Sequence, residues 1–516
     1  MQLDQQATTG FEHVKQRQFR FYNVLVTALM ATGSFGAGYA ASIIGTTLAQ
    51  PSFLSYFELT TRPDGTQLTA TTNGLFFTGG VLGVGTISWM ADRWGRLWAL
   101  RVSSAVCLVA SACLAGSVGI GMFIAFRTLS GAGVFMLVGA IPMWISETAP
   151  PSVRGFLGDF HSVGILFGYA LASYVGYGFY QLPPTDDMAW RGPFVVGCGP
   201  LAFHLVALFF LPESPRWLMM QGRAELAERT LRRLHTADEA AVEMRQISAA
   251  IEVDRHLDSS WASMFLRPAY RKRILISSSV VVMVESAGVL VINNYGPSIY
   301  GSLGFDTDRQ LVYNMGYNTM SVTGGLISLL IIDRIKRPRM LATGLTGACA
   351  TLIVLAAILA NNDPTAPGVD KDALRAGVAV IYIYTLTFEL FLNGTMFTYM
   401  AELFPTHIRS KGLVVTTASL TAINILWTQV APTAFDAIGW KFYLCFIIPP
   451  MLFAILVWFT FPNTLGVPLE DIARIFGDHE ESYMCELTES SAGERQPNKE
   501  KPANETEAAV EVCHWA

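Results

Sequence analysis

Ionisable side chains stand inside three long apolar segments of this sequence. Glu285 and Glu389 lie well within two of them, and His161 lies about one turn into a third. An ionisable group deep in a bilayer costs at least about 2.5 kcal/mol, so such groups usually face a cavity. Carboxylic acids there can exchange protons and bind polar solutes. For His161 two interpretations stay open: an imidazole that titrates near neutral pH, or a core histidine hydrogen-bonded to a carbonyl.

Amide and aromatic groups accompany these acids. Asn393 follows Glu389 by four residues, which places both side chains on the same inward face of a helix. The segment containing Glu285 ends in Asn293, Asn294 and Tyr295, followed by Gly and Pro. Proline lacks a backbone donor and glycine loosens the preceding turn, so this end is either a broken, amide-lined gate or a simple helix stop.

One further pair of side chains has two possible roles. Asn424 and Trp427 are one turn apart in another apolar segment and are candidates for the floor of a cavity. A lipid-facing Trp427 is the alternative.

No pattern in the chain indicates an enzyme. Its 7 cysteines are scattered without metal-ligand or disulfide spacing, and we find no His–Asp cluster, nucleophile motif or nucleotide loop. Basic residues form short clusters rather than a face interleaved with aromatics, which argues against nucleic acid as a partner. We therefore expect no cofactor, no metal and no catalytic residue.

The composition indicates a membrane protein. Of 516 residues, 52% are hydrophobic and only 15% are charged, against a usual charged share of about 25%. The mean hydropathy is +0.39. Too few charges are available to cover a soluble multidomain protein, so the lipid bilayer is the expected solvent.

Twelve stretches are long and apolar enough to be membrane helices, which need about 20 residues each. This predicts an all-α polytopic protein with two sets of six spans, residues 21–211 and 274–461, separated by a polar loop, 212–273, with an amphipathic helical stretch at Ala224 to His235. The predicted spans are 21–45, 70–90, 99–119, 121–145, 157–178, 191–211, 274–296, 311–332, 340–360, 376–400, 413–435 and 440–461.

Basic residues in the short loops set the orientation. Lys and Arg fall on one side of the predicted spans, while the opposite loops are acidic, which places both termini in the cytoplasm. Residues 1–20 form a cytoplasmic segment and residues 462–516 an acidic tail that we expect to be disordered. A multi-pass monomer in the plasma membrane is the expected state.

Two motifs recur about 241 to 255 residues apart. Glu147 to Arg154 and Glu402 to Arg409 both read E-x-x-P-x-x-x-R after the fourth span of each half. Asp92 to Arg96 is echoed by Asp333 to Arg337 between the second and third spans. The halves are therefore parallel repeats, an architecture typical of transporters.

These motifs resemble the major facilitator superfamily and, within it, the sugar-porter family, over residues 20–476. The resemblance rests on five segments: Ala91 to Arg96, Arg127 to Gly133, Glu147 to Gly155, Pro212 to Leu218 and Glu402 to Arg409. Gln50 to Phe53 and Asn294 to Tyr300 are most similar to its fungal branch. The resemblance implies two six-helix bundles and transport of a small molecule by alternating access.

Charged residues of these motifs sit beside helix ends, where they can pair across the two bundles and separate when the inside opens. Exposed pairs contribute only about 0–1 kcal/mol each, so a network is needed to bias the conformations. The alternative is that these charges have no role in gating and only follow the positive-inside rule. The expected gating network contains Asp92, Arg93, Arg96, Arg127, Glu147, Arg154, Glu213, Arg216, Asp333, Arg334, Glu402 and Arg409.

The expected hexose pocket is largely absent. Amide side chains suit sugars because they both donate and accept hydrogen bonds. By resemblance, Ser162 stands where the fifth span would carry Gln, Val284 and Glu285 replace a Gln pair, and Leu290 and Leu420 replace Asn. Phe397 likewise replaces Trp, and Ala40 replaces the first-span acid of proton symporters. The candidate substrate-binding residues are His161, Ser162, Glu285, Asn293, Asn294, Tyr295, Glu389, Asn393, Asn424 and Trp427.

These observations predict a secondary transporter of a small polar organic solute, either proton-coupled or facilitative, with a pocket that diverges from that of sugar porters. A modified sugar, an organic acid or a fungal specialised metabolite fits this pocket, and the direction of transport stays open. Ala40 favours a facilitator, whereas Glu285 offers a replacement carboxyl group for proton coupling. A transporter-like nutrient sensor is a further alternative, but the tail of about forty residues is short for signalling.

Overall fold

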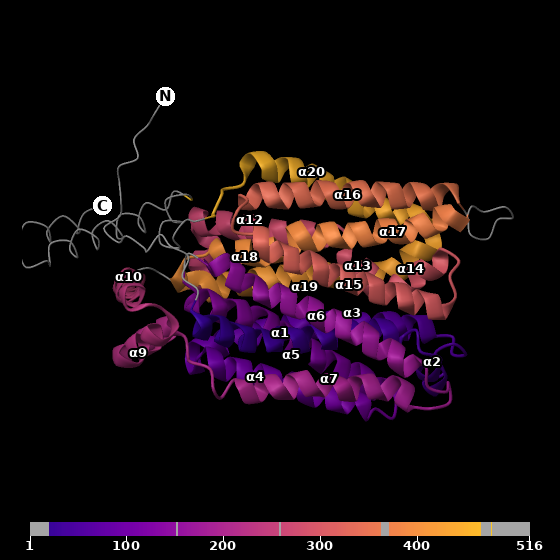
Figure 1. Cartoon of the computed structure of the whole chain (residues 1–516), viewed down its shortest axis with the longest axis horizontal. Coiled ribbons are helices and arrows are strands. Elements are labelled where there is room, and N and C mark those ends of the chain that lie inside the picture. Colours follow the sequence, from indigo (N-terminus) through magenta and orange to yellow (C-terminus); the bar gives the residue numbers. More distant parts are fainter. Residues whose placement is uncertain (1–19, 151–152, 257–259, 363–370, 466–475, 477–516) are drawn as a thin grey trace, which may run out of the picture.

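The computed structural model describes residues 20–150, 153–256, 260–362, 371–465 and 476, and among these residues no strand is present. Long helices run side by side along the longest axis of the molecule (Figure 1). The N-terminal helices form one half of the bundle, and the C-terminal helices form the other.

The N-terminal half consists of six long helices and a short one. The short helix α2 (Pro51–Tyr56) follows the first long helix at the end of the bundle away from α9 and α10 (Figure 1). The long helices are α1 (Phe21–Thr47), α3 (Gly65–Trp94), α4 (Arg96–Ala115), α5 (Ile120–Thr148), α6 (Arg154–Tyr180) and α7 (Met188–Ala207).

The C-terminal half repeats this arrangement with interrupted helices. Its continuous helices are α15 (Thr307–Ile331), α16 (Arg337–Asn361) and α19 (Thr406–Ile438). Its interrupted spans are α12 (Pro268–Glu285), α13 (Val289–Asn294) and α14 (Gly296–Ser302); α17 (Lys371–Phe388), the π-helical turn η2 (Glu389–Asn393) and α18 (Gly394–Glu402); and the 3₁₀ turn η3 (Gly439–Tyr443) with α20 (Leu444–Thr460).

These helices confirm the predicted spans. Ten helical segments among the described residues are long and apolar enough to cross a membrane, and α7 and α15, of 20 and 25 residues, complete two sets of six. In lipid every backbone polar group must be paired within its own segment, which leaves helices as the available solution for these sequences. Large apolar side chains on the outer surface are the expected contact with lipid, for example Leu82, Phe203, Leu330, Leu452 and Phe459.

Small residues allow the helices of the N-terminal half to approach closely. A Cβ atom on Gly79 would lie 1.9 Å from the carbonyl oxygen of Thr128, and one on Gly131 would lie 1.8 Å from that of Phe76. Both contacts join α3 to α5. Van der Waals packing through small residues is a main source of helix association in lipid, where no hydrophobic driving force operates between helices.

Breaks in the seventh span lie at two places. The backbone between α13 and α14 departs from helical geometry at Tyr295, within the segment that the sequence marked as a broken end. A second break, which the sequence analysis missed, separates α12 from α13 at Gly288, where φ is +94°. A Cβ atom there would lie 2.9 Å from Phe446, so both the backbone angle and the packing require glycine.

The loop between the halves is folded. It contains α8 (Pro215–Met220), α9 (Ala224–Leu234), α10 (Ala237–His256) and α11 (Trp261–Leu266), and α9 matches the predicted amphipathic stretch. Figure 1 shows α9 and α10 projecting beyond one end of the bundle. The guanidinium group of Arg20, just before α1, donates to the backbone carbonyls of Arg232 (2.8 Å) and His235.

Residues 1–19, 466–475 and 477–516 lie outside the described residues. The predictions for the N-terminal segment and for most of the acidic tail therefore stay predictions.

Candidate functional site: a cavity between the two halves

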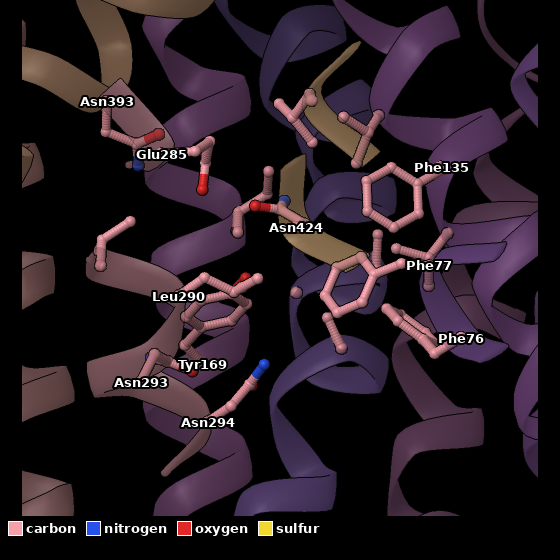
Figure 2. A pocket seen from close by; sticks show the side chains of 18 of the residues that line it. Phe76, Phe77, Phe135, Tyr169, Glu285, Leu290, Asn293, Asn294, Asn393 and Asn424 are labelled. Carbon is pink, nitrogen blue, oxygen red and sulfur yellow. The ribbon is translucent and has the colours of Figure 1, made fainter. Parts of the chain in front are cut away.

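A cavity lies in the interior of the bundle, between the two halves. Helices α1, α3, α5 and α6 line it from the N-terminal half, and α12, α13, α17, η2, α18 and α19 line it from the C-terminal half. Its two walls differ in chemistry, as Figure 2 shows. Phe76, Phe77 and Phe135 lie on one side of this view, and Glu285, Asn293, Asn294 and Asn393 lie on the other side together with Tyr169 and Leu290.

The C-terminal wall is polar. Glu285, at the last residue of α12, lines the cavity and is 9% exposed, and Glu389, at the start of η2, lines it as well. The amide of Asn393 donates to the carboxyl group of Glu389 (2.6 Å), as the four-residue spacing predicted. The remaining amides on this wall are Asn293, Asn294 and Asn424.

Two of these amides differ in their bonding. Asn293 donates to Asn318 of α15 at 3.3 Å, which fixes its orientation. The carbonyl oxygen of the Asn424 side chain has no hydrogen-bond partner among the described residues. A buried polar atom without a partner is costly, so this acceptor is well placed to receive a donor from a bound solute.

The N-terminal wall is apolar. Phe76, Phe77 and Phe135 form a cluster of rings whose centroids lie 5.2–6.0 Å apart. Val134, Val138, Ile165 and Leu166 extend this surface. These side chains offer dispersion and aromatic contacts but no hydrogen bonds to a hydroxyl group. The polar groups that line the cavity from this half are Asn73, Arg127 and Tyr169.

Arg127 lies on the cavity wall rather than in the gating network where the sequence analysis expected it. Its guanidinium group donates to the backbone carbonyls of Ala40 (2.6 Å) and Ala41 (3.1 Å) and stands 4.0 Å above the ring of Phe76. Among the described lining residues it alone has a basic side chain. Arg127 thus bonds backbone carbonyls of the first span at Ala40, the position where the family resemblance implies an acidic residue.

Four predicted binding residues do not line this cavity. His161 is fully buried, hydrogen-bonded to Ser34 of α1 (2.7 Å) and edge-on to Phe397, so it is a core histidine whose partner is a hydroxyl rather than the expected carbonyl. Ser162 is buried beside Asp159.

The other two pack against the C-terminal half. Trp427, which is half-buried, donates to Ser286 at the break in the seventh span (3.1 Å) and packs against Phe446, so it does not line the cavity. Tyr295 donates to the carbonyl of Thr428 (2.8 Å) and borders a separate space toward the α2 end of the bundle.

The repeated motifs meet at one end of the bundle, which we call the motif end. In the N-terminal copy, Arg96 makes two hydrogen bonds of 3.0 Å to Glu147 and one of 3.3 Å to Asp92. Glu213 accepts from the backbone N–H groups of Arg96 and Leu97 at 3.2 Å. This copy of the expected network is thus assembled.

The C-terminal copy uses Arg337, which the sequence analysis left out of the network. Arg337 donates to Glu402 (3.1 Å) and Asp333 (3.4 Å) and occupies the position of Arg96 in the repeat. The aligned repeat motifs carried this signal. Removing one partner of a buried ion pair typically costs 3–5 kcal/mol, so these pairs weigh far more than exposed ones.

Hydrogen bonds between described residues join the halves at the motif end. The carboxyl group of Asp92 accepts from the Ser410 hydroxyl in the first turns of α19 (3.0 Å), and that of Asp333 accepts from the Phe156 backbone N–H at the start of α6 (3.0 Å). A Cβ atom on Gly155 would lie 1.9 Å from Asp333, so only glycine permits this approach. The motif end is closed by this symmetric pair of contacts.

The remaining network residues have different places. Arg93 and Arg334 are exposed and form no ion pair with another described residue, so the structure does not bring them into the network. Arg216 is buried in α8. Arg409 donates to the carbonyl of Phe404 (3.2 Å) and acts electrostatically on Glu147 of the other half. The side chain of Arg154 lies outside the described residues.

Two cavity residues and a buried acid near the cavity carried no signal that the sequence analysis used. Asn73 and Tyr169 line the cavity from α3 and α6, and Asp159 is buried on α6 between the cavity and the motif end. An acid at position 159, in an apolar span with Ser162 and His161, satisfies the same criterion that singled out Glu285.

Two six-helix halves that enclose a solute-sized cavity, closed at one end by contacts between repeated motifs, define a secondary transporter. The profile of the family described as sugar (and other) transporter matches residues 26–476, and the chain belongs to this family.

Curated relatives are similar over most of the chain. The MFS-type transporter criB of Aspergillus cristatus is 28% identical over 459 residues, covering 88% of this chain and 93% of that protein. A probable quinate permease of Aspergillus clavatus is 28% identical over 478 residues, covering 88% of each. These relatives agree with the predicted fungal branch of the major facilitator superfamily, whose members transport solutes.

A solved structure supports the fold. The proton:xylose symporter XylE bound to 6-bromo-6-deoxy-D-glucose aligns with a TM-score of 0.77 and 23% identity, covering 89% of this chain and 100% of that structure. The similarity establishes the major facilitator arrangement of helices.

Proposed function

We propose that this transporter carries a neutral cyclic metabolite with one apolar face and one hydroxylated or amide-bearing edge, rather than a hexose. The two-sided lining of the cavity carries this proposal. A hexose presents hydroxyl groups around its whole ring, and those that face Phe76, Phe77 and Phe135 would find no hydrogen-bond partner in these rings. Each buried hydroxyl without a partner costs about 1–3 kcal/mol.

The positions that diverge from sugar porters support this substrate class. Leu290, Phe397 and Leu420 all lie on the cavity wall, where the resemblance expected amides or tryptophan. Each replacement exchanges a hydrogen-bonding group for apolar surface.

The charges on the wall favour a neutral solute over an anion. Glu285 and Glu389 are the acids of the lining, and Arg127 already donates to two backbone carbonyls. A carboxylate such as that of quinate, the solute named for several relatives, would meet two acids and one arginine whose two terminal nitrogens already donate to backbone carbonyls. A fungal specialised metabolite with a partly apolar ring fits the same wall.

Substrate choice is tested with purified protein in proteoliposomes. We expect 4-hydroxybenzyl alcohol, a neutral aromatic diol, to enter at least about tenfold faster than D-glucose, because two unpaired hydroxyls cost about 2–6 kcal/mol. Quinate provides the anionic comparison. Leu290→Asn with Leu420→Asn should raise glucose uptake relative to the unmodified chain. Robust glucose uptake by the unmodified protein would refute the proposal.

We further propose that the protein resides in the plasma membrane with the motif end in the cytoplasm. The concentration of Lys and Arg in the loops at that end supports this orientation. Both termini and the helices α9 and α10 are then cytoplasmic.

Orientation is tested by cysteine labelling in intact cells, in a background lacking the 7 native cysteines. Asp187→Cys, at an exposed position at the opposite end, should react with an impermeant thiol reagent from outside. The matched variant Arg93→Cys, exposed at the motif end, should react only after permeabilisation. Labelling in the reverse order would contradict the proposed topology.

A further inference from the structure

Asp159 is a buried acid that neither the cavity lining nor the ion pairs of the motif end employ. It lies on α6, one turn beyond the start of the helix, and is 1% exposed. Neither of its carboxyl oxygens has a hydrogen-bond partner within ordinary distance among the described residues. The hydroxyl groups of Ser162 and Ser328 lie beside it, on α6 and α15.

Charged groups act on Asp159 from both directions. Asp333 and Arg337 act on it from the motif end, and Glu389 acts on it from the cavity. Its carboxyl group packs where a Cβ atom on Gly394 would stand, 2.1 Å from Oδ1, so it reaches the junction of η2 and α18. The titratable neighbour on its own helix, His161, points instead to Ser34 of α1.

Three acids therefore follow one another from the cavity toward the motif end. Glu285 and Glu389 line the cavity and interact electrostatically, and Glu389 in turn interacts with Asp159. Like charges at short range disfavour simultaneous ionisation. The three acids therefore lose their protons one after another rather than all at once.

The last acid stands next to the contact that opens. The hydrogen bond from the Phe156 backbone to Asp333 lies one turn before Asp159 on the same helix and joins the two halves. When the halves separate at this end, the bond breaks and α6 moves away from Asp333 and Arg337. Asp159 then meets cytoplasmic water.

We propose that Asp159 is the inner station of a proton path that runs from Glu285 through Glu389, so that opening of the motif end releases the transported proton. The inference rests on the proposed transport function and on proton coupling through Glu285, one of the two modes of transport that the sequence predicts. One proton moves at each step: the acid form of Glu285 protonates ionised Glu389, which protonates ionised Asp159. Asp159 then gives the proton to water, forming hydronium and leaving a carboxylate.

If opening of the motif end releases a proton, the pH must in turn affect how readily the motif end opens. A buried carboxylate without a counter-ion is strongly disfavoured, so the closed state holds Asp159 in its neutral form. Deprotonation favours the open state, in which the carboxylate is hydrated. Raising the pH should therefore open the motif end.

The test measures gate opening in the full chain without a transported solute. Thr398 borders a small space between Phe397 and Glu402, toward the motif end. In liposome-reconstituted protein lacking native cysteines, Thr398→Cys is labelled by an impermeant thiol reagent supplied from the motif end at pH 5.5–8. Release of one proton on opening predicts a labelling rate that rises by up to about tenfold per pH unit.

Variants separate the path from a structural role. Asp159→Asn should reduce this pH slope by one proton and remove one protonated-carboxyl band from infrared difference spectra between acid and alkaline pH. Asp159→Glu should keep the slope and the band, which guards against an Asn variant that misfolds. Ser328→Ala, which removes a neighbouring hydroxyl but no acid, serves as the matched control and should behave as wild type.

Each outcome has a distinct meaning. If Asp159→Asn left the pH slope and the infrared spectrum unchanged, Asp159 would not be the inner station of the path. This holds even if Glu285→Gln removes its own band, a result that would still support proton coupling at the cavity. If neither variant altered the spectrum, both the path and the proposed coupling would fail.

Discussion

Glu285→Gln should abolish accumulation of a transported solute against its gradient while leaving exchange measurable. With one proton per neutral solute molecule, a gradient of one pH unit supports about tenfold accumulation, since one pH unit corresponds to about 1.4 kcal/mol. Glutamine keeps the size and hydrogen-bonding capacity of the side chain but cannot carry a proton. The internal solute concentration should therefore fall to the external value.

The measurement uses proteoliposomes with an imposed pH gradient and 4-hydroxybenzyl alcohol. Exchange of labelled for unlabelled solute at equal pH reports whether the site still binds. Asp187→Asn provides the control, because Asp187 is an exposed acid far from the cavity. Wild-type transport that ignores the pH gradient would make the protein a facilitator, with Glu285 as a binding or structural group.

Arg96→Ala should slow transport strongly while the protein remains folded in the membrane. The change leaves the buried carboxyl group of Glu147 without its bidentate partner and weakens the hold on Asp92, which bonds the opposite half. Loss of about 3–5 kcal/mol of ion pairing favours states in which the motif end is open. Turnover falls because the carrier then returns rarely to the closed state.

Exposed neighbours supply matched controls. Arg93→Ala and Arg334→Ala remove arginines that form no ion pair with a described residue and should transport at wild-type rates. Arg337→Ala should reproduce the defect of Arg96→Ala, because the two arginines are equivalent in the repeat. Initial rates and protein abundance in the membrane are measured together. Equal rates in Arg96→Ala and Arg93→Ala would refute the gating role.

The sequence predicted the helices well, because a bilayer imposes a length and a composition on each span. The repeated motifs predicted the division into two halves and the contacts between charged residues at one end of the bundle. The break at Gly288 was missed, because its cause is a ring from α20 that packs against the backbone. No local pattern contains that contact.

The site was harder to predict than the fold. Glu285 and Glu389, which the sequence analysis singled out by the cost of burying an acid, both line the cavity. His161 and Trp427 do not line the cavity, because each makes a hydrogen bond to a residue away from it. Residue spacing shows which side chains share a face of a helix. It does not show which neighbouring helix that face packs against, because this depends on tertiary packing.

The aromatic rings of the cavity have a consequence for its hydration. Water is poorly held beside phenyl rings and aliphatic side chains, whereas the acids and amides of the opposite wall keep their water when no solute is bound. A solute that covers the rings therefore displaces weakly held water, while a solute that displaces water from the amides must replace its hydrogen bonds. The cavity thus discriminates between solutes by the water that each of them displaces.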